Sequence, residues 1–266
     1  PPGRALVGED AAECQLALPR PLPPGARPGP VGTGALRIPE LPADARLPDV
    51  PVPPAGAGAP DALAAVPIGP GGDDGSLLRV DLRRGGGMLV VGPPRSGRTA
   101  TLHALGQTLS DAGVGLAALV RNRRAGGPGL PGAAPLSADD VAGWRTWLTG
   151  LDGRPGALLL DDAGTLGDSA VLAVLTATDL AEHDVVVLAA GTAGELSTAF
   201  RGPVADLRRS RSGLLLRPGP GDADLLGIRL PRTPVPARPG SGWLAAAGLV
   251  RRVQVARHAA DPGPAR

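Results

Sequence analysis

Residues 88–102, MLVVGPPRSGRTATL, place residue types that can hold phosphate at the spacing that this chemistry requires. An apolar stretch leads into a loop bracketed by Gly92 and Gly97, and Arg98 and Thr99 follow the second glycine directly. The spacing is that of the phosphate-binding loop G-x-x-x-x-G-K-[ST], with arginine in place of lysine. Backbone N–H groups in such a loop point inward at the phosphates, beside the positive end of the following helix. The predicted phosphate-binding residues are Gly92, Pro93, Pro94, Arg95, Ser96, Gly97, Arg98 and Thr99.

The loop departs from the common pattern at Arg98. Lysine reaches a phosphate as a compact point charge, whereas the guanidinium group is larger, planar and suited to two-point contact. We therefore expect Arg98 to hold phosphate but to fit the γ-phosphate less well. Because the chain contains no lysine, the arginine also agrees with a general replacement of lysine by arginine in this sequence. Thr99 is predicted to place its hydroxyl on Mg²⁺.

A pair of carboxylates ends a second apolar stretch, ALLLDD, at residues 157–162. An acid at the end of a buried strand holds Mg²⁺ in many nucleotide-binding proteins, and Asp161 takes this position. Hydrolytic sites commonly continue with a glutamate that orients the attacking water, but here the next residue is Asp162, which is shorter by one methylene. The alternative is that Asp162 only caps the turn before Gly164. The predicted catalytic residues are Asp161, Asp162 and Arg98.

One threonine and a group of three arginines are further candidates, and each has two interpretations. Thr192 ends the apolar stretch VVVLAAGT, where a polar residue can sense a γ-phosphate or can cap the following helix. Arg208, Arg209 and Arg211 come just before another apolar stretch. They are candidates for an arginine that reaches the nucleotide of a neighbouring subunit, and their alternative is a solvated, charged loop.

Composition limits the class of protein. The chain has 266 residues, of which 41 are glycine and 32 are proline, so we expect a folded core of roughly 180–200 residues. Cys14 is the only cysteine, which excludes an internal disulfide and is typical of a reducing compartment. No apolar run approaches the roughly 18 residues of a membrane-spanning helix. The chain does not begin with methionine, and we expect it to be a piece of a longer protein.

Charge is distributed unevenly along the chain. From residue 201 onward there are 12 arginines and 4 aspartates, although the net charge of the whole chain is only +2. A basic C-terminal third suits an acidic partner, a neighbouring subunit or nucleic acid, and its alternative is a solvated arginine-rich surface.

The order of linkers and apolar stretches predicts the domain organisation. Residues 19–62 are expected to form a Pro/Gly-rich connector that contains one short ordered turn within 38–49. Residues 63–257 are expected to be the folded domain, and 258–266 a disordered tail.

A weak internal repeat suggests what precedes the connector. Residues 1–18 resemble the stretch from Pro239 onward, and the pairing places Gln15 on Gln254. Residues 1–18 are therefore expected to be the tail of a preceding, similar module, and the alternative is a chance likeness in a biased sequence.

Within the folded domain, short apolar stretches alternate with helical patterns, which predicts a mostly parallel sheet with helices on both faces. A helix is expected to follow the phosphate loop, and another to begin at Ser137, capped by Ser137 with Asp140 three residues later. Further helices are expected at 169–182 and 193–200, with a helical turn at 222–226, and the arginine-rich stretch before residue 214 is expected to be a turn. The three tryptophans are expected to pack in the core. Strands are expected at 66–69, 77–82, 88–91, 116–120, 158–161, 185–190, 214–217 and 250–256.

The motifs GPPRSGRT, LLLDD, VVVLAAGT and RRSRSGLLLRPGPGDADLLGIRLPR together resemble the FtsK/SpoIIIE family of P-loop motors over about residues 64–256. The sequence is most similar to the C-terminal ATPase module of actinobacterial type VII secretion proteins of the EccC kind. The resemblance implies a RecA-like fold, ATP with Mg²⁺, and a hexameric ring. It places the family's catalytic glutamate on Asp162 and its P-loop lysine on Arg98, two departures within one site.

Three functions follow from the resemblance and the residues. The first is an ATP-binding module of a secretion motor with weak or absent hydrolysis, located in the cytoplasm at the membrane through an upstream segment. The second is a DNA translocase domain. The third is a pseudo-ATPase scaffold that binds a partner or an exported protein. Expected partners are neighbouring ATPase modules or a homo-oligomeric ring, together with an exported protein or DNA.

Overall fold

The computed structural model of the protein describes residues 4–7, 12–15, 40–47, 61–73, 75–119, 132–167, 169–232 and 234–258. The chain divides into two units. One, Pro1–Ile38 with Pro231–Pro234, contains a two-stranded hairpin, and the other contains the main sheet with its helices. Most of the expected connector and nearly all of the expected tail lie outside the described residues.

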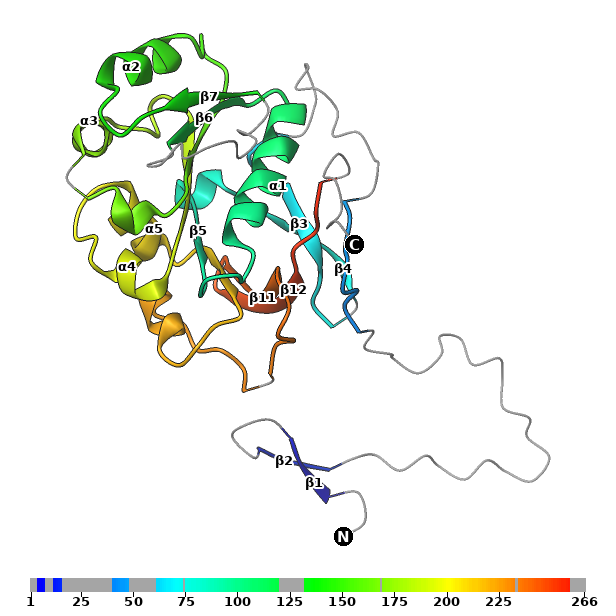
Figure 1. Cartoon of the computed structure of the whole chain (residues 1–266). Coiled ribbons are helices and arrows are strands. Elements are labelled where there is room, and N and C mark those ends of the chain that lie inside the picture. Colours follow the sequence, from blue (N-terminus) through cyan, green and yellow to red (C-terminus); the bar gives the residue numbers. More distant parts are fainter. Residues whose placement is uncertain are drawn as a thin grey trace. The chain divides into compact units, whose positions relative to one another are not determined.

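Ten strands of the second unit form one sheet in the described part of the chain, in the order β4-β3-β12-β11-β10-β5-β9-β8-β6-β7 (Figure 1). Near its centre is β5, the strand that leads into the phosphate loop. Every pairing from β10 to β7 is parallel, so the carboxyl ends of these strands meet at one edge. The parallel strands are β5 (Gly87–Val91), β6 (Gly115–Leu119), β7 (Ala133–Leu136), β8 (Gly156–Leu160), β9 (Val185–Gly191) and β10 (Gly213–Leu216).

The remaining four strands extend the sheet in antiparallel pairing beyond β10. They form two hairpins, and both strands of the hairpin nearer the N-terminus were predicted, at 66–69 and 77–82. The antiparallel strands are β3 (Val66–Gly71), β4 (Ser76–Val80), β11 (Ser241–Ala246) and β12 (Leu249–Gln254). The predicted α/β fold with a mostly parallel sheet is confirmed, with this antiparallel extension added.

Helices cover both faces of the sheet (Figure 1). The helix α1 packs on one face, and α2, α3 and α5 pack on the other. Short 3-10 turns complete the connections: η1 (Arg83–Gly85), η2 (Ala163–Thr165) and η3 (Asp222–Leu226). The helices are α1 (Arg98–Asp111), α2 (Val141–Thr149), α3 (Ala170–Ala177), α4 (Ala193–Ser197) and α5 (Pro203–Ser210).

The strand β5 shows why its sequence is apolar throughout. Successive side chains of a strand point to opposite faces, and both faces of β5 are covered. Met88 and Val90 join the core beneath α1, whereas Leu89 and Val91 join the core beneath α2, α3 and α5. The two cores hold β5 rigidly, and with it the start of the phosphate loop.

Four expected elements differ from the structure, and two strands were not expected. The helix α2 begins after Asp140, whose carboxylate accepts a hydrogen bond from the Gly143 amide at 2.8 Å, while Ser137 lies in the preceding turn. The arginine-rich stretch expected to be a turn contains α5, because Val204 and Leu207 find a core to pack against. The helices α3 and α4 end earlier than expected, at Ala177 and Ser197. The strands β7 and β11 were not predicted, because alanine and glycine weaken their apolar pattern.

The two segments of the proposed repeat have the same local structure. Residues Arg4–Val7 and Ala12–Gln15 form an antiparallel hairpin, as β11 and β12 do. Gln15 pairs with the first residue of its hairpin, Arg4, and Gln254 pairs with the first residue of its own, Ser241. That residues 1–18 are the tail of a preceding copy of the module stays a prediction.

No helix among the described residues has the length and apolar character needed to cross a membrane.

Trp144 is the largest fully buried side chain, and its ring lies 4.9 Å from that of Trp147 between centroids. Replacing a buried aromatic with alanine removes contacts and leaves a cavity, which costs about 3–5 kcal/mol. We expect Trp144→Ala to lower the free energy of unfolding by this amount in urea denaturation. Leu249→Ala is the control, because Leu249 is 59% exposed and should cost less than about 0.5 kcal/mol. Equal losses for the two variants would contradict the described core.

Candidate nucleotide-binding site

The phosphate loop connects β5 to α1 at the carboxyl edge of the parallel strands. A turn closes the loop, with the Ser96 amide donating to the Pro93 carbonyl at 3.2 Å. Gly97 is the N-cap of α1 and has φ of 100°, a left-handed conformation that favours glycine. Arg95 also has positive φ, at 63°. The loop therefore carries the backbone turns that direct amides inward ahead of a helix.

Gly92 is required by close packing rather than by its backbone angles. A Cβ atom at Gly92 would lie 2.5 Å from the Leu216 carbonyl oxygen and from Ser96 Oγ. A Cβ atom at Gly97 would lie 2.9 Å from the Gly240 nitrogen. The loop is thus held from behind by the end of β10 and by the turn at Gly240.

Arg98 makes two contacts that the sequence did not predict. Its guanidinium donates to the Gly92 carbonyl at 2.8 Å and to Asp162 Oδ1 at 3.2 Å. The Arg98 side chain is only 14% exposed, whereas that of Asp162 is 58% exposed. The two residues that depart from the family pattern therefore contact each other.

Asp162 follows Asp161 at the end of β8 and has φ of 48°, in the left-handed region. It is the N-cap residue of η2, but its side chain accepts no capping hydrogen bond. Its backbone carbonyl accepts from the Thr165 amide and hydroxyl, both at 2.8 Å. The Asp162 carboxylate is thus available to Arg98, and the simple capping interpretation does not describe it.

The electrostatics of Asp162 oppose its ionisation. Partial burial, and then the neighbouring Asp161 carboxylate, raise the pKa of Asp162 above its ordinary value. The guanidinium of Arg98 offsets part of this rise, and Glu195 adds to it. The carboxylate therefore lies in a cluster of acids with Arg98 as its cationic contact.

Asp161 and Thr99 lie together, as the predicted Mg²⁺ site requires. The Thr99 hydroxyl donates to Asp161 Oδ2 at 2.9 Å. Hydroxyl and carboxylate oxygens are the ligands that Mg²⁺ prefers, with water filling most other positions. The described residues contain no group of three or more His, Cys, Asp or Glu side chains that could hold a metal ion by themselves. Thr99 and Asp161 therefore fit a Mg²⁺ that arrives with a nucleotide.

The Ser96 side chain is buried within the loop. Its side chain is 1% exposed, and its Oγ has no hydrogen-bond partner. A buried hydroxyl without a partner costs free energy, so native structures seldom leave one.

Thr192 is the N-cap of α4. Its hydroxyl accepts from the Glu195 amide at 3.2 Å, and it donates to Glu195 Oε2 at 2.8 Å. The Thr192 amide donates to the same carboxylate at 2.9 Å, and these bonds lower the pKa of Glu195. This is the capping arrangement given above as the alternative, and a sensing role for Thr192 stays a prediction.

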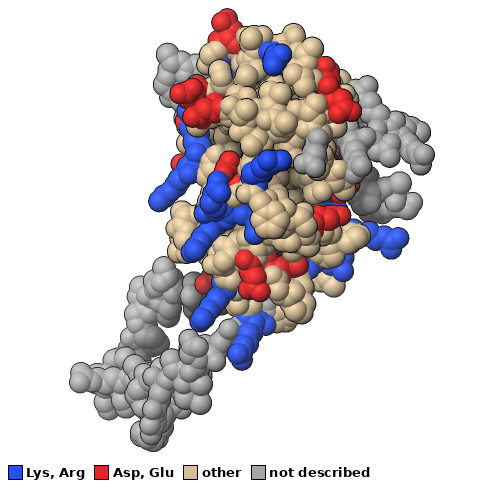
Figure 2. All heavy atoms as spheres, turned by 90° about the vertical axis from the view of Figure 1, so that its left-hand side faces the viewer, with Lys and Arg blue, Asp and Glu red and all other residues tan. Residues whose placement is uncertain are grey.

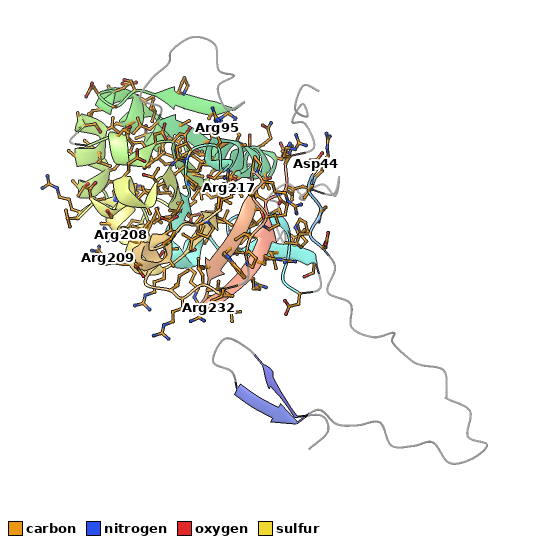
Figure 3. All side chains as sticks on the ribbon, turned by 60° about the horizontal axis from the view of Figure 1, so that its bottom comes forward. Asp44, Arg95, Arg208, Arg209, Arg217 and Arg232 are labelled. Carbon is orange, nitrogen blue, oxygen red and sulfur yellow. The ribbon has the colours of Figure 1, made fainter. Side chains whose placement is uncertain are left out.

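The three arginine-finger candidates lie at the end of α5, and Figure 3 labels two of them, Arg208 and Arg209. Arg208 donates to the carbonyls of Ser197 and Ala199 at 3.0 and 2.9 Å, which holds the end of α4. Arg209 pairs with Asp206 on the same helix. Arg211 caps α5 just before the amino end of β10, at the edge opposite to the phosphate loop. None of the three is placed at this chain's own loop, so a finger role would be toward a neighbour.

Arg217 is a candidate that the sequence reasoning missed. It follows β10 directly, and its guanidinium lies 3.5 Å from the Arg95 carbonyl oxygen, beside the loop (Figure 3). The signal was available, because a charged residue directly after an apolar strand next to β5 must lie at the ligand-binding edge of the sheet.

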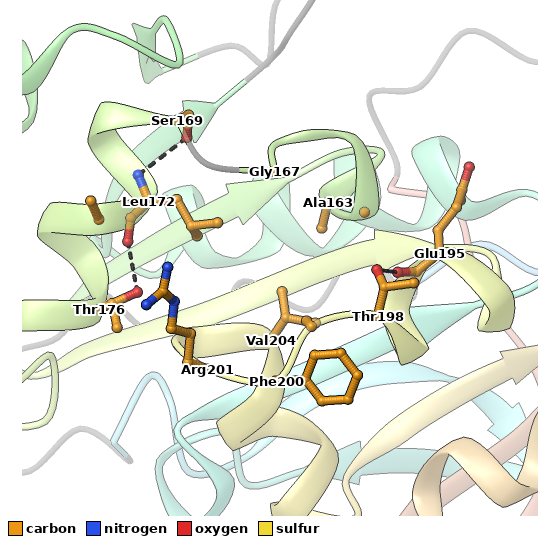
Figure 4. Close-up of a pocket in the computed structure, with 13 residues that line it drawn as sticks. Ala163, Gly167, Ser169, Leu172, Thr176, Glu195, Thr198, Phe200, Arg201 and Val204 are labelled. Carbon is orange, nitrogen blue, oxygen red and sulfur yellow. Dashed lines mark hydrogen bonds between the residues drawn. The ribbon is translucent and has the colours of Figure 1, made fainter.

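A hollow of about 690 Å³ opens next to the site, between η2, α3, α4 and the start of α5 (Figure 4). Gly164 and Glu195 line the hollow, and Glu195 also raises the pKa of Asp162. Phe200 lies at the hollow and is 87% exposed, and the Arg201 side chain reaches toward Thr176 (Figure 4).

Comparison with known proteins places the fold. No family model matches the chain, and no curated protein sequence matches it. Among solved structures, EssC (ATPases 2 and 3) from Geobacillus thermodenitrificans superposes with a TM-score of 0.60, at 16% identity over 73% of this chain and 41% of that one. The chain has the fold of the EssC and EccC ATPase domains.

Two further structures agree with this fold. Thermomonospora curvata EccC (ATPases 2 and 3), in complex with a signal sequence peptide, matches with a TM-score of 0.56 and 17% identity over 82% of this chain. The pCW3 conjugation coupling protein TcpA, with ATPγS, matches with a TM-score of 0.51 and 12% identity over 82% of this chain and 71% of TcpA. The chain spans less than half of the EssC and EccC chains, at 41% and 44% of their lengths.

The raised pKa of Asp162 predicts how its charge affects stability. A raised pKa means that the carboxylate is less stable in the folded chain than in the unfolded chain, and Asp162→Asn removes this charge while keeping the shape. We expect the variant to have a higher Tm than the wild type at neutral pH, by no more than about 3 °C because the Asp162 side chain is 58% exposed. The difference should vanish below the ordinary pKa of 3.8, where Asp162 is protonated in both states.

Thermal unfolding followed by circular dichroism across this pH range measures the effect. A variant that is less stable than the wild type at neutral pH would contradict the prediction, because it would mean that the contact with Arg98 outweighs burial and repulsion.

Proposed function

We propose that this chain is an ATP-binding motor domain of the FtsK/SpoIIIE type, one module of a type VII secretion ATPase, with slow or absent hydrolysis. The observation that carries the proposal is the contact between Arg98 and Asp162 within a well-formed phosphate loop. The loop supports binding, and the contact supports slow turnover.

Binding is supported by the loop and its two oxygen ligands. The amides of Arg95 and of residues 97–99 lie in the loop or in the first turn of α1, whose positive end favours anions. Thr99 and Asp161 would hold Mg²⁺, directly or through water. The ion, when bound with nucleotide, would neutralise phosphate charge.

Slow hydrolysis is supported by the same contacts. A phosphate that recruits Arg98 must compete with Asp162 and with the Gly92 carbonyl for the guanidinium. A residue that orients the attacking water must present a free carboxylate, whereas the carboxylate of Asp162 contacts Arg98. The short aspartate and the large arginine therefore impede each other's roles.

The place in a secretion machine is supported by the comparisons and by the hollow beside Phe200. The similar EccC structure holds a signal sequence peptide, and we propose that this chain also contacts an exported segment or a neighbouring module. The exposed Phe200 gives such a contact an apolar anchor. We place the domain in the cytoplasm, attached to the membrane through the longer protein.

A DNA translocase domain is the second candidate, because arginines gather on the face that carries α3, α4 and α5 (Figure 2). Duplex DNA binding that is tight and that weakens steeply with added salt would favour this candidate over a secretion module.

Nucleotide binding predicts thermal stabilisation. A ligand that binds only the folded state at 100 times its Kd adds about 2.7 kcal/mol, which corresponds to about 5–10 °C in Tm. We expect Mg·ATP and Mg·ADP to raise the Tm of the wild type in this range. Thr99→Ala should lose most of the Mg²⁺-dependent part, and Thr149→Ala, at the exposed end of α2, should keep it. If neither nucleotide shifts the wild-type Tm, the scaffold function replaces the ATP-binding one.

Slow turnover predicts that the family residues restore hydrolysis. We expect the double variant Arg98→Lys, Asp162→Glu to hydrolyse ATP at least about tenfold faster than the wild type, because it frees the base and restores the point charge. Phosphate release under saturating Mg·ATP measures both rates. A wild-type rate equal to that of the double variant would show that the contact between Arg98 and Asp162 does not limit turnover.

A further inference from the structure

A short segment of the expected connector lies along the C-terminal strands of the domain. Residues 40–47, named here the strap, belong to the same unit as the sheet. The Leu47 amide donates to the Arg257 carbonyl at 3.0 Å, and the Arg257 amide donates to the Ala45 carbonyl at 2.8 Å. Arg257 also donates through Nε to the Asp44 carboxylate at 3.0 Å, and Figure 3 labels Asp44. Leu41 and Ala45 are buried, so the strap is docked by apolar contact as well.

Arg238 connects the strap to the domain interior. Its guanidinium donates to the carbonyls of Leu41 and Pro42 at 2.6 and 3.3 Å. Through Nε it donates to Gln254 Oε1 at 3.0 Å. One planar side chain therefore holds the main chain of the strap and the amide of a residue on β12, which suits the fixed fork of an arginine.

Gln254 connects Arg238 to the turn that lies behind the phosphate loop. It is 3% exposed, and its Nε2 donates to the Pro239 carbonyl at 3.0 Å. The next residue, Gly240, donates its amide to the Ser96 carbonyl at 2.8 Å. Gly240 has φ of 75°, and a Cβ atom there would lie 2.9 Å from Gln254 Nε2, so the side chain of Gln254 packs closely against this turn.

We propose that the strap regulates nucleotide binding at the phosphate loop through Arg238 and Gln254, as positioning residues. This inference rests on the proposed nucleotide-binding function. The loop binds phosphate through amides that must already point inward, and Gly240 holds the loop at Ser96 from behind. When the strap is docked, the turn at Gly240 is fixed and the loop is pre-organised. When the strap is released, the loop must be ordered at the expense of binding free energy.

The strap is well placed for regulation because it lies between the domain and whatever precedes it in the chain. A force or contact that pulls residues 40–47 away acts on Arg238 first, and through Gln254 on the loop. The occupancy of the nucleotide site would in turn favour a docked strap, because coupling between two sites is reciprocal.

Full-length variants test the proposal at Arg238 and at the strap itself. Arg238→Met breaks the contacts to the strap and to Gln254. Ala45→Glu places a long charged side chain at a buried position of the strap, and so releases the strap without altering Arg238. We expect each variant to raise the Kd of a fluorescent ADP analogue about five- to twentyfold. We expect the double variant to show no further loss, because both changes break one coupled pathway.

Arg154→Met is the matched control, since Arg154 also donates to two main-chain carbonyls, those of Leu151 and Gly150, but lies away from the loop. It should leave the Kd unchanged. Arg238→Lys should recover part of the affinity, because an ammonium group can reach one of the three acceptors.

Amide hydrogen exchange without nucleotide provides a readout independent of binding. Arg238→Met and Ala45→Glu should both speed the exchange of amides in residues 95–99, and Arg154→Met should not. Additive losses in the double variant, or unchanged affinity and exchange in folded Arg238→Met, would overturn the proposal. A wild type that binds no nucleotide would instead overturn the proposed function, so the two failures are distinguishable.

Discussion

The guanidinium of Arg98 joins two chain segments that the sheet keeps apart. The phosphate loop follows β5 and Asp162 follows β8, and β9 lies between these strands. The parallel half of the sheet brings the three carboxyl ends to one edge, where a long side chain can reach across the end of β9 to the acid beyond it. The same geometry brings Thr99 to Asp161. The slow turnover that we propose depends on this reach.

The reach has a cost for catalysis that follows from residue types alone. A lysine at residue 98 would present one compact charge, whereas arginine presents several donors in a fixed plane and uses two of them within the protein. Each of these contacts must be released or shared when a phosphate arrives. Behind the loop, Gly240 and Gln254 act in the opposite sense and hold the loop ready. The site therefore combines a prepared backbone with a side chain that is already engaged.

Much of this arrangement could be predicted from the sequence, because the parallel strands are continuous apolar runs and the loop has the spacing of a phosphate site. The antiparallel strands β11 and β7 could not be predicted so well, since glycine and alanine give no clear period and their pairing partners are distant in sequence. The helix α5 was missed because arginines mask Val204 and Leu207, which pack against the core in the folded chain.

The site residues divide in the same way. Gly92 to Thr99 and the acidic pair were found from local spacing, which is a property of consecutive residues. Arg217, Arg238 and Gln254 were not found, because their roles depend on contacts between segments that are remote along the chain. The contact of Arg98 with Asp162 spans 64 residues and could not be inferred from either motif by itself.

The position of β5 in the sheet has a consequence for biosynthesis. Its two neighbours, β9 (Val185–Gly191) and β10 (Gly213–Leu216), are both made long after it. While the ribosome is still translating the intervening segment, β5 has neither edge paired and exposes an uncharged, aggregation-prone strand. Both edges of β5 can be paired only after β10 has been synthesised, so the part of the sheet that carries the phosphate loop is completed late.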